Sequence, residues 1–188
     1  MEFYHFDRLK TLKRGQTIVL KDYRYLPLND LNCKKILENL DYKLSAHGEN
    51  MLLRLFPEGY NLTDQYIDLI LELIRQAYFP QKQSRLQSVF AFKNLTDYKS
   101  FETFAKLKLG EFSIAVLECD ACSVHDAAWL TGFAKFANNS GEAFSNVTLL
   151  DNMFHYWNGD ISRNPSIECL LPTDITVKEI VSPNILLA

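Results

Sequence analysis

The chain has 188 residues and is close to neutral, with 20 Lys and Arg against 23 Asp and Glu for a net charge of −3. This balance argues against a general nucleic-acid binder or an acidic-membrane binder, because such proteins carry an excess of positive charge. Hydrophobic residues make up 47% and charged residues 23%, which indicates one globular domain rather than a disordered chain. Aromatic residues reach 13% and either fill a core or also line a site.

The N-terminus has no apolar run of the length that a signal peptide requires, and no other apolar cluster approaches the length of a membrane span. Four cysteines are too few to form a disulfide scaffold in a chain of this length. We therefore expect a soluble, cytoplasmic protein with reduced thiols and no membrane partner, with export by a non-classical route left open.

The first half of the chain predicts short strands and then helices. The strongest helical pattern ends at Phe79-Pro80 and carries one broad apolar stripe, which includes Tyr66 and Tyr78. The expected elements are strands at 2–6 and 16–20, a helix at 31–44, mostly loop over 45–60 with a turn of helix within 51–56 as the alternative, and a helix at 62–78.

The second half of the chain alternates more evenly between the two types of element. Strands are expected at 88–92, 112–119, 167–171 and 175–181, and helices at 96–109 and 147–157 with a further short helix near 126–137. Together the two halves predict a mixed α+β domain of about six strands and four helices, with strands near both ends of the chain.

The tightest metal-like spacing is Cys119-x-x-Cys122-x-x-His125. Zinc requires four converging ligands, and the remaining Cys and His residues offer no second pair in ligand spacing. We therefore expect a buried pair of free cysteines at a strand end and no bound metal, with a metal or redox site as the alternative.

Three polar features stand beside predicted strands. Cations at Arg8, Lys10, Lys13 and Arg14 follow the first strand, as a solvated face or as an anion site. Ser84-Arg85-Leu86-Gln87-Ser88 enters an apolar strand, where Arg85 could bind a phosphate or carboxylate or the serines could satisfy a turn. Glu168 opens the strand Ile167–Leu171, either as a solvent-facing residue or as a site charge.

The order of these segments resembles the ADP-ribosyltransferase superfamily, whose members bind NAD between two small split sheets. Tyr4-His5 and Arg8 resemble the first motif of the His-type branch, the segment 84–92 resembles the middle motif, and Glu168 with its strand resembles the third. The opening segment also resembles the DNA-modifying bacterial toxin branch. The whole chain is similar to a little-described bacterial family with Tyr-His-x-x-Arg, Ser-Arg-x-Gln-Ser and Tyr-Trp-x-Gly signatures, here ending in Tyr156-Trp157-Asn158-Gly159.

The resemblance implies a single domain over residues 1–188, with split and mostly antiparallel sheets and flanking helices. It implies NAD as substrate, Glu168 and His5 as catalytic residues, and Ser166 in place of a second acid, which favours an acceptor other than an arginine side chain. The residues that it implies for NAD binding are Arg8, Arg85, Ser84 and Ser88, with Phe92, Tyr98 and Trp157 as candidates for stacking on nicotinamide.

The sequence leaves three candidate functions. The first is a bacterial toxin or effector that transfers ADP-ribose to a protein or nucleic-acid acceptor, or a glycohydrolase that transfers it to water. The second is a non-enzymatic binding or effector module on the same fold. The third is an RNA-phosphate transferase, which the lack of a broad basic surface disfavours.

Overall fold

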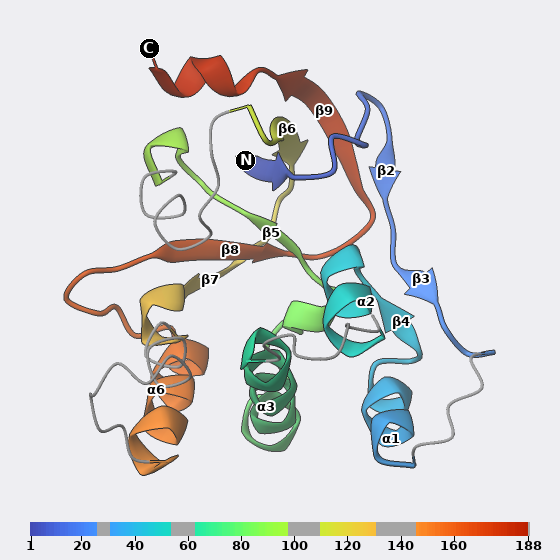
Figure 1. Ribbon diagram of the computed structural model, residues 1–188, viewed down its shortest axis with the longest axis vertical. Helices are drawn as coiled ribbons and strands as arrows, with labels where there is room; N and C mark the ends of the chain where they lie inside the picture. Colours follow the sequence, from blue (N-terminus) through green and yellow to red (C-terminus); the bar gives the residue numbers. More distant parts are fainter. Residues whose placement is uncertain (26–30, 54–62, 98–109, 131–145, 188) are drawn as a thin grey trace.

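Two antiparallel sheets form the centre of the fold in the computed structural model, which describes residues 1–25, 31–53, 63–97, 110–130 and 146–187 (Figure 1). The larger sheet has the order β1–β6–β9–β2, with β1 (Glu2–Asp7), β6 (Ser113–Glu118), β9 (Ile175–Val181) and β2 (Thr17–Ile18). The smaller sheet has the order β5–β8–β7, with β5 (Val89–Ala91), β8 (Ile167–Leu171) and β7 (Ser123–Asp126). A further pair consists of β3 (Lys21–Asp22) and β4 (Lys43–Leu44).

The two sheets meet where β1 runs past the end of β5. The backbone N–H of Tyr4 donates to the carbonyl of Phe92 at 2.8 Å, and the N–H of Phe92 donates to the carbonyl of Tyr4 at 2.9 Å. This bridge brings His5, the next residue of β1, beside the smaller sheet that contains Glu168.

Figure 1 shows the helices α1 (Leu31–Asn39), α3 (Thr63–Tyr78) and α6 (Asn146–Asn158) below β8, with α2 (Ala46–Leu52) beside β4. Short 3-10 turns lie between these elements: η1 (Arg85–Gln87), η2 (Leu95–Asp97), η3 (Ala127–Leu130) and η4 (Pro183–Leu187). Among the described residues, none of the helices combines the length and apolar character needed to cross a membrane.

The core follows this division into helices and sheets. Leu71, Met153, Trp157 and Leu170 join α3, α6 and β8 in one buried cluster. A second cluster fills the space between the two sheets and includes Phe3, Val89, Leu117, Leu171 and Val177. Because β8 contributes side chains to both clusters, it is packed on both of its faces, and this packing fixes its position.

The predicted α+β class is confirmed, and so are the strands at 2–6, 112–119, 167–171 and 175–181 and the helices at 62–78 and 147–157. The loop predicted over 45–60 is wrong in its first part, because Ser45 caps α2: its Oγ accepts a hydrogen bond from the N–H of Gly48 at 3.2 Å. The strand β7 was not predicted, since its four residues are mostly polar. Most of the predicted helix at 96–109 and most of that at 126–137 lie outside the described residues. The described parts belong to η2, to the end of β7 and to η3.

The predicted apolar stripe of α3 is narrower than its sequence spacing indicates. Ile67, Leu71 and Ile74 are buried, whereas the rings of Tyr66 and Tyr78 are 57% and 65% exposed. The stripe therefore covers one helix face against α6, and the aromatic residues at its edges face outward.

Candidate functional site

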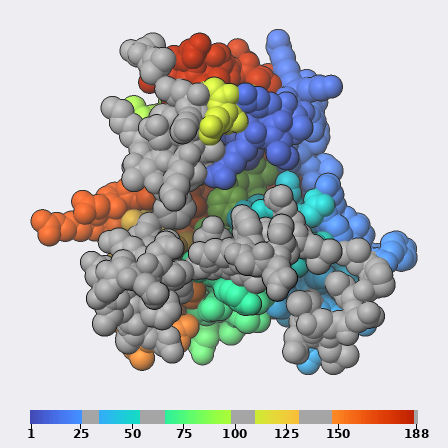
Figure 2. Space-filling view, in the orientation of Figure 1, coloured from blue at the N-terminus to red at the C-terminus, as the bar shows by residue number. Residues whose placement is uncertain are grey.

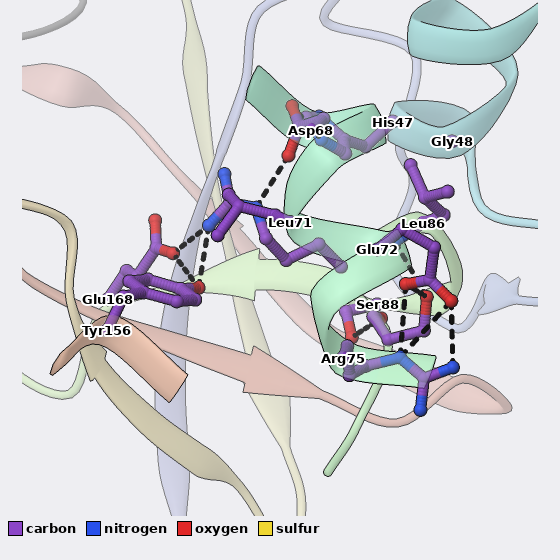
Figure 3. Close-up of polar contacts among 12 residues, drawn as sticks. His47, Gly48, Asp68, Leu71, Glu72, Arg75, Leu86, Ser88, Tyr156 and Glu168 are labelled. Atoms are coloured by element: carbon purple, nitrogen blue, oxygen red, sulfur yellow. Dashed lines mark hydrogen bonds and ion pairs between the residues drawn. The ribbon is translucent and has the colours of Figure 1, made fainter. Parts of the chain in front are cut away.

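A largely buried polar cluster joins η1 to β8, and Arg85 is its centre. Figure 3 labels three of the partners of Arg85, namely Asp68, Tyr156 and Glu168. The Arg85 Nε donates to Oδ1 of Asp68 at 2.6 Å, and its Nη1 donates to the hydroxyl of Tyr156 at 2.7 Å. Nη1 also forms an ion pair with Oε1 of Glu168, which accepts a hydrogen bond of 2.6 Å from the hydroxyl of Tyr156. Three elements, α3, α6 and β8, thus supply the partners of one guanidinium group.

The turn that presents Arg85 is held by its two flanking serines. Ser84 caps η1, since its Oγ accepts from the N–H of Leu86 at 3.2 Å and donates to Oε2 of Glu72 at 2.8 Å. The Oγ of Ser88 donates to the carbonyl of Ser84 at 2.6 Å. Both serines are buried, so their hydroxyls serve the turn rather than a ligand, which is the second of the two interpretations of this segment.

The helix α3 carries three charged residues on its inner face, at successive turns. Asp68 binds Arg85, while Glu72 accepts hydrogen bonds from Ser84 and from the guanidinium of Arg75. Arg75 also donates to the carbonyls of Pro80 and Lys82, and so ties the loop after α3 back to the helix. These three residues therefore hold η1 and the loop before it against one face of α3.

Charge and burial shift the pKa values of this cluster. Burial alone would raise the pKa of Asp68, but the positive charge of Arg85, together with the contacts that Arg85 and His47 make with the carboxylate, outweighs burial and holds that pKa well below its usual value. Burial alone would lower the pKa of Arg85, but its contacts with Glu168, Tyr156 and Asp68 raise that pKa well above its usual value. Burial raises the pKa of the Tyr156 hydroxyl well above its usual value, so the phenol stays protonated and donates to Glu168.

Phe90 of β5 is the aromatic wall of the cluster. The guanidinium carbon of Arg85 lies 4.7 Å from the centre of the Phe90 ring and 5.3 Å from that of Tyr156. The ring of His47 packs against Phe90 with centroids 4.4 Å apart, and its Nε2 lies 3.1 Å from Oδ2 of Asp68. Phe90 and His47 are both only half-buried, so this wall reaches the surface.

His5 joins the same wall from the larger sheet. Its Nδ1 lies 2.7 Å from the carbonyl oxygen of Phe90, which can only accept, so Nδ1 carries the proton and Nε2 is an acceptor. Burial lowers the pKa of His5 and outweighs the carbonyl contact that raises it, which favours the neutral ring. Phe90 therefore contacts both His5 and Arg85, and Arg85 in turn is paired with Glu168.

The remaining residues expected at an NAD site are not part of this cluster. Arg8 is exposed beyond the end of β1. Phe92 is buried and stacks on Phe6 with centroids 5.1 Å apart, and Trp157 is 0% exposed and donates from its indole N–H to the carbonyl of Leu71. Neither ring offers an exposed face for nicotinamide, and Tyr98 lies outside the described residues.

The cysteine motif forms the connection between the two sheets and the start of β7. Cys119 and Cys122 are half-buried rather than buried, whereas Cys169 of β8 is buried. Both ring nitrogens of His125 already have partners, Ser123 Oγ at 2.7 Å and the Tyr156 carbonyl at 2.8 Å. Within the described ranges, no group of three or more His, Cys, Asp or Glu side chains is arranged to hold a metal ion.

Asp68, His47 and Tyr156 are the site residues that the sequence patterns did not single out. Asp68 and Glu72 are acidic residues four apart within a helix that also carries an apolar stripe, and this spacing is a usable signal for a buried charge. Tyr156 belongs to the Tyr-Trp-x-Gly segment, but nothing local distinguishes its role from that of Trp157. His47 lies in a segment predicted as loop.

Comparison with protein-family models gives one result that spans this whole arrangement. The model described as "Protein of unknown function (DUF2441)" matches residues 3–183. The chain belongs to this family. No curated protein matches the chain.

In this DUF2441 member the cluster around Arg85 has groups that could bind a charged ligand beside the Phe90 ring: a carboxylate for a cationic group and a guanidinium for an anionic one. Oε2 of Glu168 and Nη2 of Arg85 have no partner among the residues that the structure describes. One carboxylate oxygen can therefore accept a hydrogen bond, and one guanidinium nitrogen can donate, without breaking a contact that is already present.

Proposed function

We propose that the protein cleaves the bond between nicotinamide and ribose in NAD and passes ADP-ribose to a macromolecular acceptor or to water. The observation that carries the proposal is that three distant segments meet around Phe90 and Arg85. His5 contacts the carbonyl group of Phe90, Arg85 lies over its ring, and Glu168 is paired with Arg85. These are the segments on which the resemblance to ADP-ribosyltransferases rests.

Glu168 is the residue that would act on the reacting carbon. When the bond between ribose C1′ and the nicotinamide nitrogen breaks, its electron pair leaves with nicotinamide and positive charge develops on the ribose. A carboxylate beside that charge stabilises it most effectively where little water competes, and the Glu168 side chain is only 12% exposed. Its Oε2 would accept a hydrogen bond from a ribose hydroxyl, which orients the sugar.

Arg85 and Tyr156 would hold this carboxylate in place. Both bind Oε1, so Glu168 is fixed by two donors while Oε2 stays available. His5, with its proton on Nδ1, would accept a hydrogen bond at Nε2 from the adenosine ribose. The half-buried Phe90, whose ring already contacts Arg85 and His47, would border the site.

The proposal is tested by incubating the purified protein with NAD labelled in the nicotinamide ring and measuring the release of free nicotinamide. We expect release by the wild type and a loss of about 100-fold or more in Glu168→Gln, since a single electrostatic contact at the reacting centre is worth that much. Glu179→Gln, the same change at an exposed position of β9, is the matched control and should retain activity.

Because Glu168 belongs to a buried ion pair, Glu168→Gln also costs stability, and each variant is assayed only where circular dichroism shows it folded. Glu168→Asp keeps the charge but shortens its reach, and should lose activity with less loss of stability. Activity in Glu168→Gln equal to that of the wild type would contradict the proposal. Binding of NAD by the wild type without nicotinamide release would replace it with the non-enzymatic binding module.

A further inference from the structure

Ser123 and His125, two residues apart on β7, form a hydrogen-bonded pair that the proposed NAD chemistry does not use. The Ser123 Oγ lies 2.7 Å from Nε2 of His125, and the His125 Nδ1 lies 2.8 Å from the backbone carbonyl oxygen of Tyr156. Because alternate residues of a strand point to the same side, both side chains lie on one face of β7.

The positions of the protons follow from the partner of Nδ1. A backbone carbonyl oxygen can only accept, so Nδ1 carries the ring proton and donates it to Tyr156. In a neutral ring Nε2 then has a lone pair, and the Ser123 hydroxyl is the donor to it. The hydroxyl proton of Ser123 therefore points at a basic nitrogen.

The surroundings of His125 keep the ring neutral and fixed. It stacks on the ring of Tyr156 with centroids 4.6 Å apart and meets the edge of Trp157 at 5.3 Å. The His125 side chain is 0% exposed, and this burial lowers its pKa, so the lone pair is available at neutral pH. Ser123 is only half-buried, so this residue, unlike His125, reaches the surface of the molecule.

We propose that Ser123 is an activated nucleophile with His125 as its general base, and that it takes up acyl groups from carboxylic esters. A nucleophile within hydrogen-bond reach of a base that is itself oriented by a third group is the arrangement that this chemistry requires. Here Ser123 is the nucleophile, His125 the base and the Tyr156 carbonyl the orienting group.

The step balances without any further reactant. The Ser123 Oγ forms a bond to the carbonyl carbon of the ester while its proton moves to Nε2 of His125. The bond between that carbon and the alcohol oxygen then breaks, and the alcohol leaves with the proton from Nε2. The product is an ester of Ser123, and water, activated by the same nitrogen, hydrolyses it.

The first test uses a fluorophosphonate probe, which reacts with activated serines, followed by mass spectrometry of the labelled peptides. We expect labelling at Ser123 in the wild type, loss of the label in Ser123→Ala, and unchanged labelling in Ser113→Ala, which alters a half-buried serine on strand β6. Absence of label on Ser123 in the folded wild type would overturn the proposal.

The second test keeps a nucleophile at the position and avoids changing the buried histidine, whose loss could unfold the chain. In Ser123→Cys the thiol lies beside the same base, so at pH 6.5 iodoacetamide should alkylate it about 100-fold faster than the thiol of Ser113→Cys. Peptide mapping separates these thiols from the native cysteines. Equal rates at the two positions would show that His125 gives no activation and would overturn the proposal. Hydrolysis of p-nitrophenyl acetate by the wild type, lost in Ser123→Ala, is the expected catalytic readout.

Discussion

Arg85 and Glu168, 83 residues apart in the sequence, form an ion pair in which the side chains are only 10% and 12% exposed. Arg85 is also bound by Asp68, so one guanidinium group compensates two buried carboxylates. The same three charges that could act on a ligand therefore also hold η1, α3 and β8 together. Substitutions in the site are expected to affect stability and function at once.

Arg85→Met tests how much the charge of Arg85 contributes to the stability of the fold. The substitution keeps much of the side-chain volume but leaves Asp68 and Glu168 buried without a counter-charge, and should lower the free energy of unfolding by about 3–5 kcal/mol. Urea titration followed by circular dichroism measures the loss. Lys43→Met, which removes an exposed ion pair with Asp41, is the control and should leave the urea midpoint unchanged.

The double variant of Arg85→Met with Glu168→Gln sharpens the same experiment. Removing the second charge takes away one of the carboxylates that the first change left unpaired, so the double variant should be less destabilised than the sum of the two single variants. Simple additivity would mean that the two side chains are not coupled in solution.

Asp68 should govern the acid stability of the protein. Its pKa in the folded protein is held below the ordinary value of 3.8, so its contribution to stability is fully present above about pH 4 and disappears as the pH falls toward the folded pKa. The difference in unfolding free energy between the wild type and Asp68→Asn should thus be largest at pH 5–7 and shrink below about pH 4. Urea titrations at several pH values measure it, and a difference that grows on acidification would contradict the assignment.

The sequence predicted those parts of the site that depend on local pattern. The strand from Ile167 to Leu171 follows from its apolar residues and flanking breaks, and it places Glu168 at the entry to a buried strand. Arg85 was recognised because it stands between two serines directly before an apolar segment. In both cases the signal lies within a few residues, where propensity and periodicity act.

The partners of these residues depend on contacts that no local pattern encodes. His47 reaches Asp68 across 21 residues, and Tyr156 reaches Arg85 across 71, so each pairing results from how whole elements pack. Phe90 and Phe92 are two residues apart, so the strand pattern would place their side chains on the same face. Phe90 is nevertheless half-buried and Phe92 is buried, because β5 ends at Ala91 and Phe92 forms the bridge to β1. The resemblance to ADP-ribosyltransferases rests on short segments of single strands, so it could not show that Phe90 would be half-buried and Phe92 buried.

Tyr156→Phe should separate the hydroxyl of this residue from its ring. The ring packing on His125 is kept, while the hydrogen bond from Arg85 and the one to Glu168 are lost. Hydrogen bonds to charged groups contribute about 1.5–3 kcal/mol each, so we expect a loss of unfolding free energy of at least that size. Tyr42→Phe, which removes the hydroxyl that donates to Glu38 at the surface, is the matched control and should have little effect on stability. Equal stability of Tyr156→Phe and the wild type would contradict the observed contacts.

Gly48→Ala should disturb the packing of α2 on the turn that carries Arg85. A Cβ atom at Gly48 would lie 2.2 Å from the backbone oxygen of Leu86, so α2 and η1 must separate to admit it. We expect a destabilisation of about 1–3 kcal/mol or more, as for other overpacked sites. Gly15→Ala meets no atom within 4 Å and is strained only by its φ of +79°, so its loss should be smaller, about 1–2 kcal/mol. Thermal unfolding of the two variants compares them.

Asp126 should control the order of the segment that leads into β8. Its Oδ1 accepts from the N–H groups of Ala128 and Ser166 at 2.9 and 2.8 Å, and its Oδ2 accepts from that of Ser162 at 2.7 Å. Residues 159–166, which project from the side of the molecule in Figure 2, are thereby tied to the end of β7 just before Glu168.

In Asp126→Asn one of the two oxygens becomes an NH₂ group that faces an N–H donor, so at least one of these buried contacts must break. We expect a loss of about 1.5–3 kcal/mol in unfolding free energy and faster amide hydrogen exchange at Ser162 or Ser166. Asp174→Asn is the control, because this exposed residue has a φ of +68° that Asn also adopts readily. If exchange at Ser162 and Ser166 stays slow in Asp126→Asn, this carboxylate does not organise the segment, and the position of Glu168 is then set by the strand pairing of β8 with β5 and β7 alone.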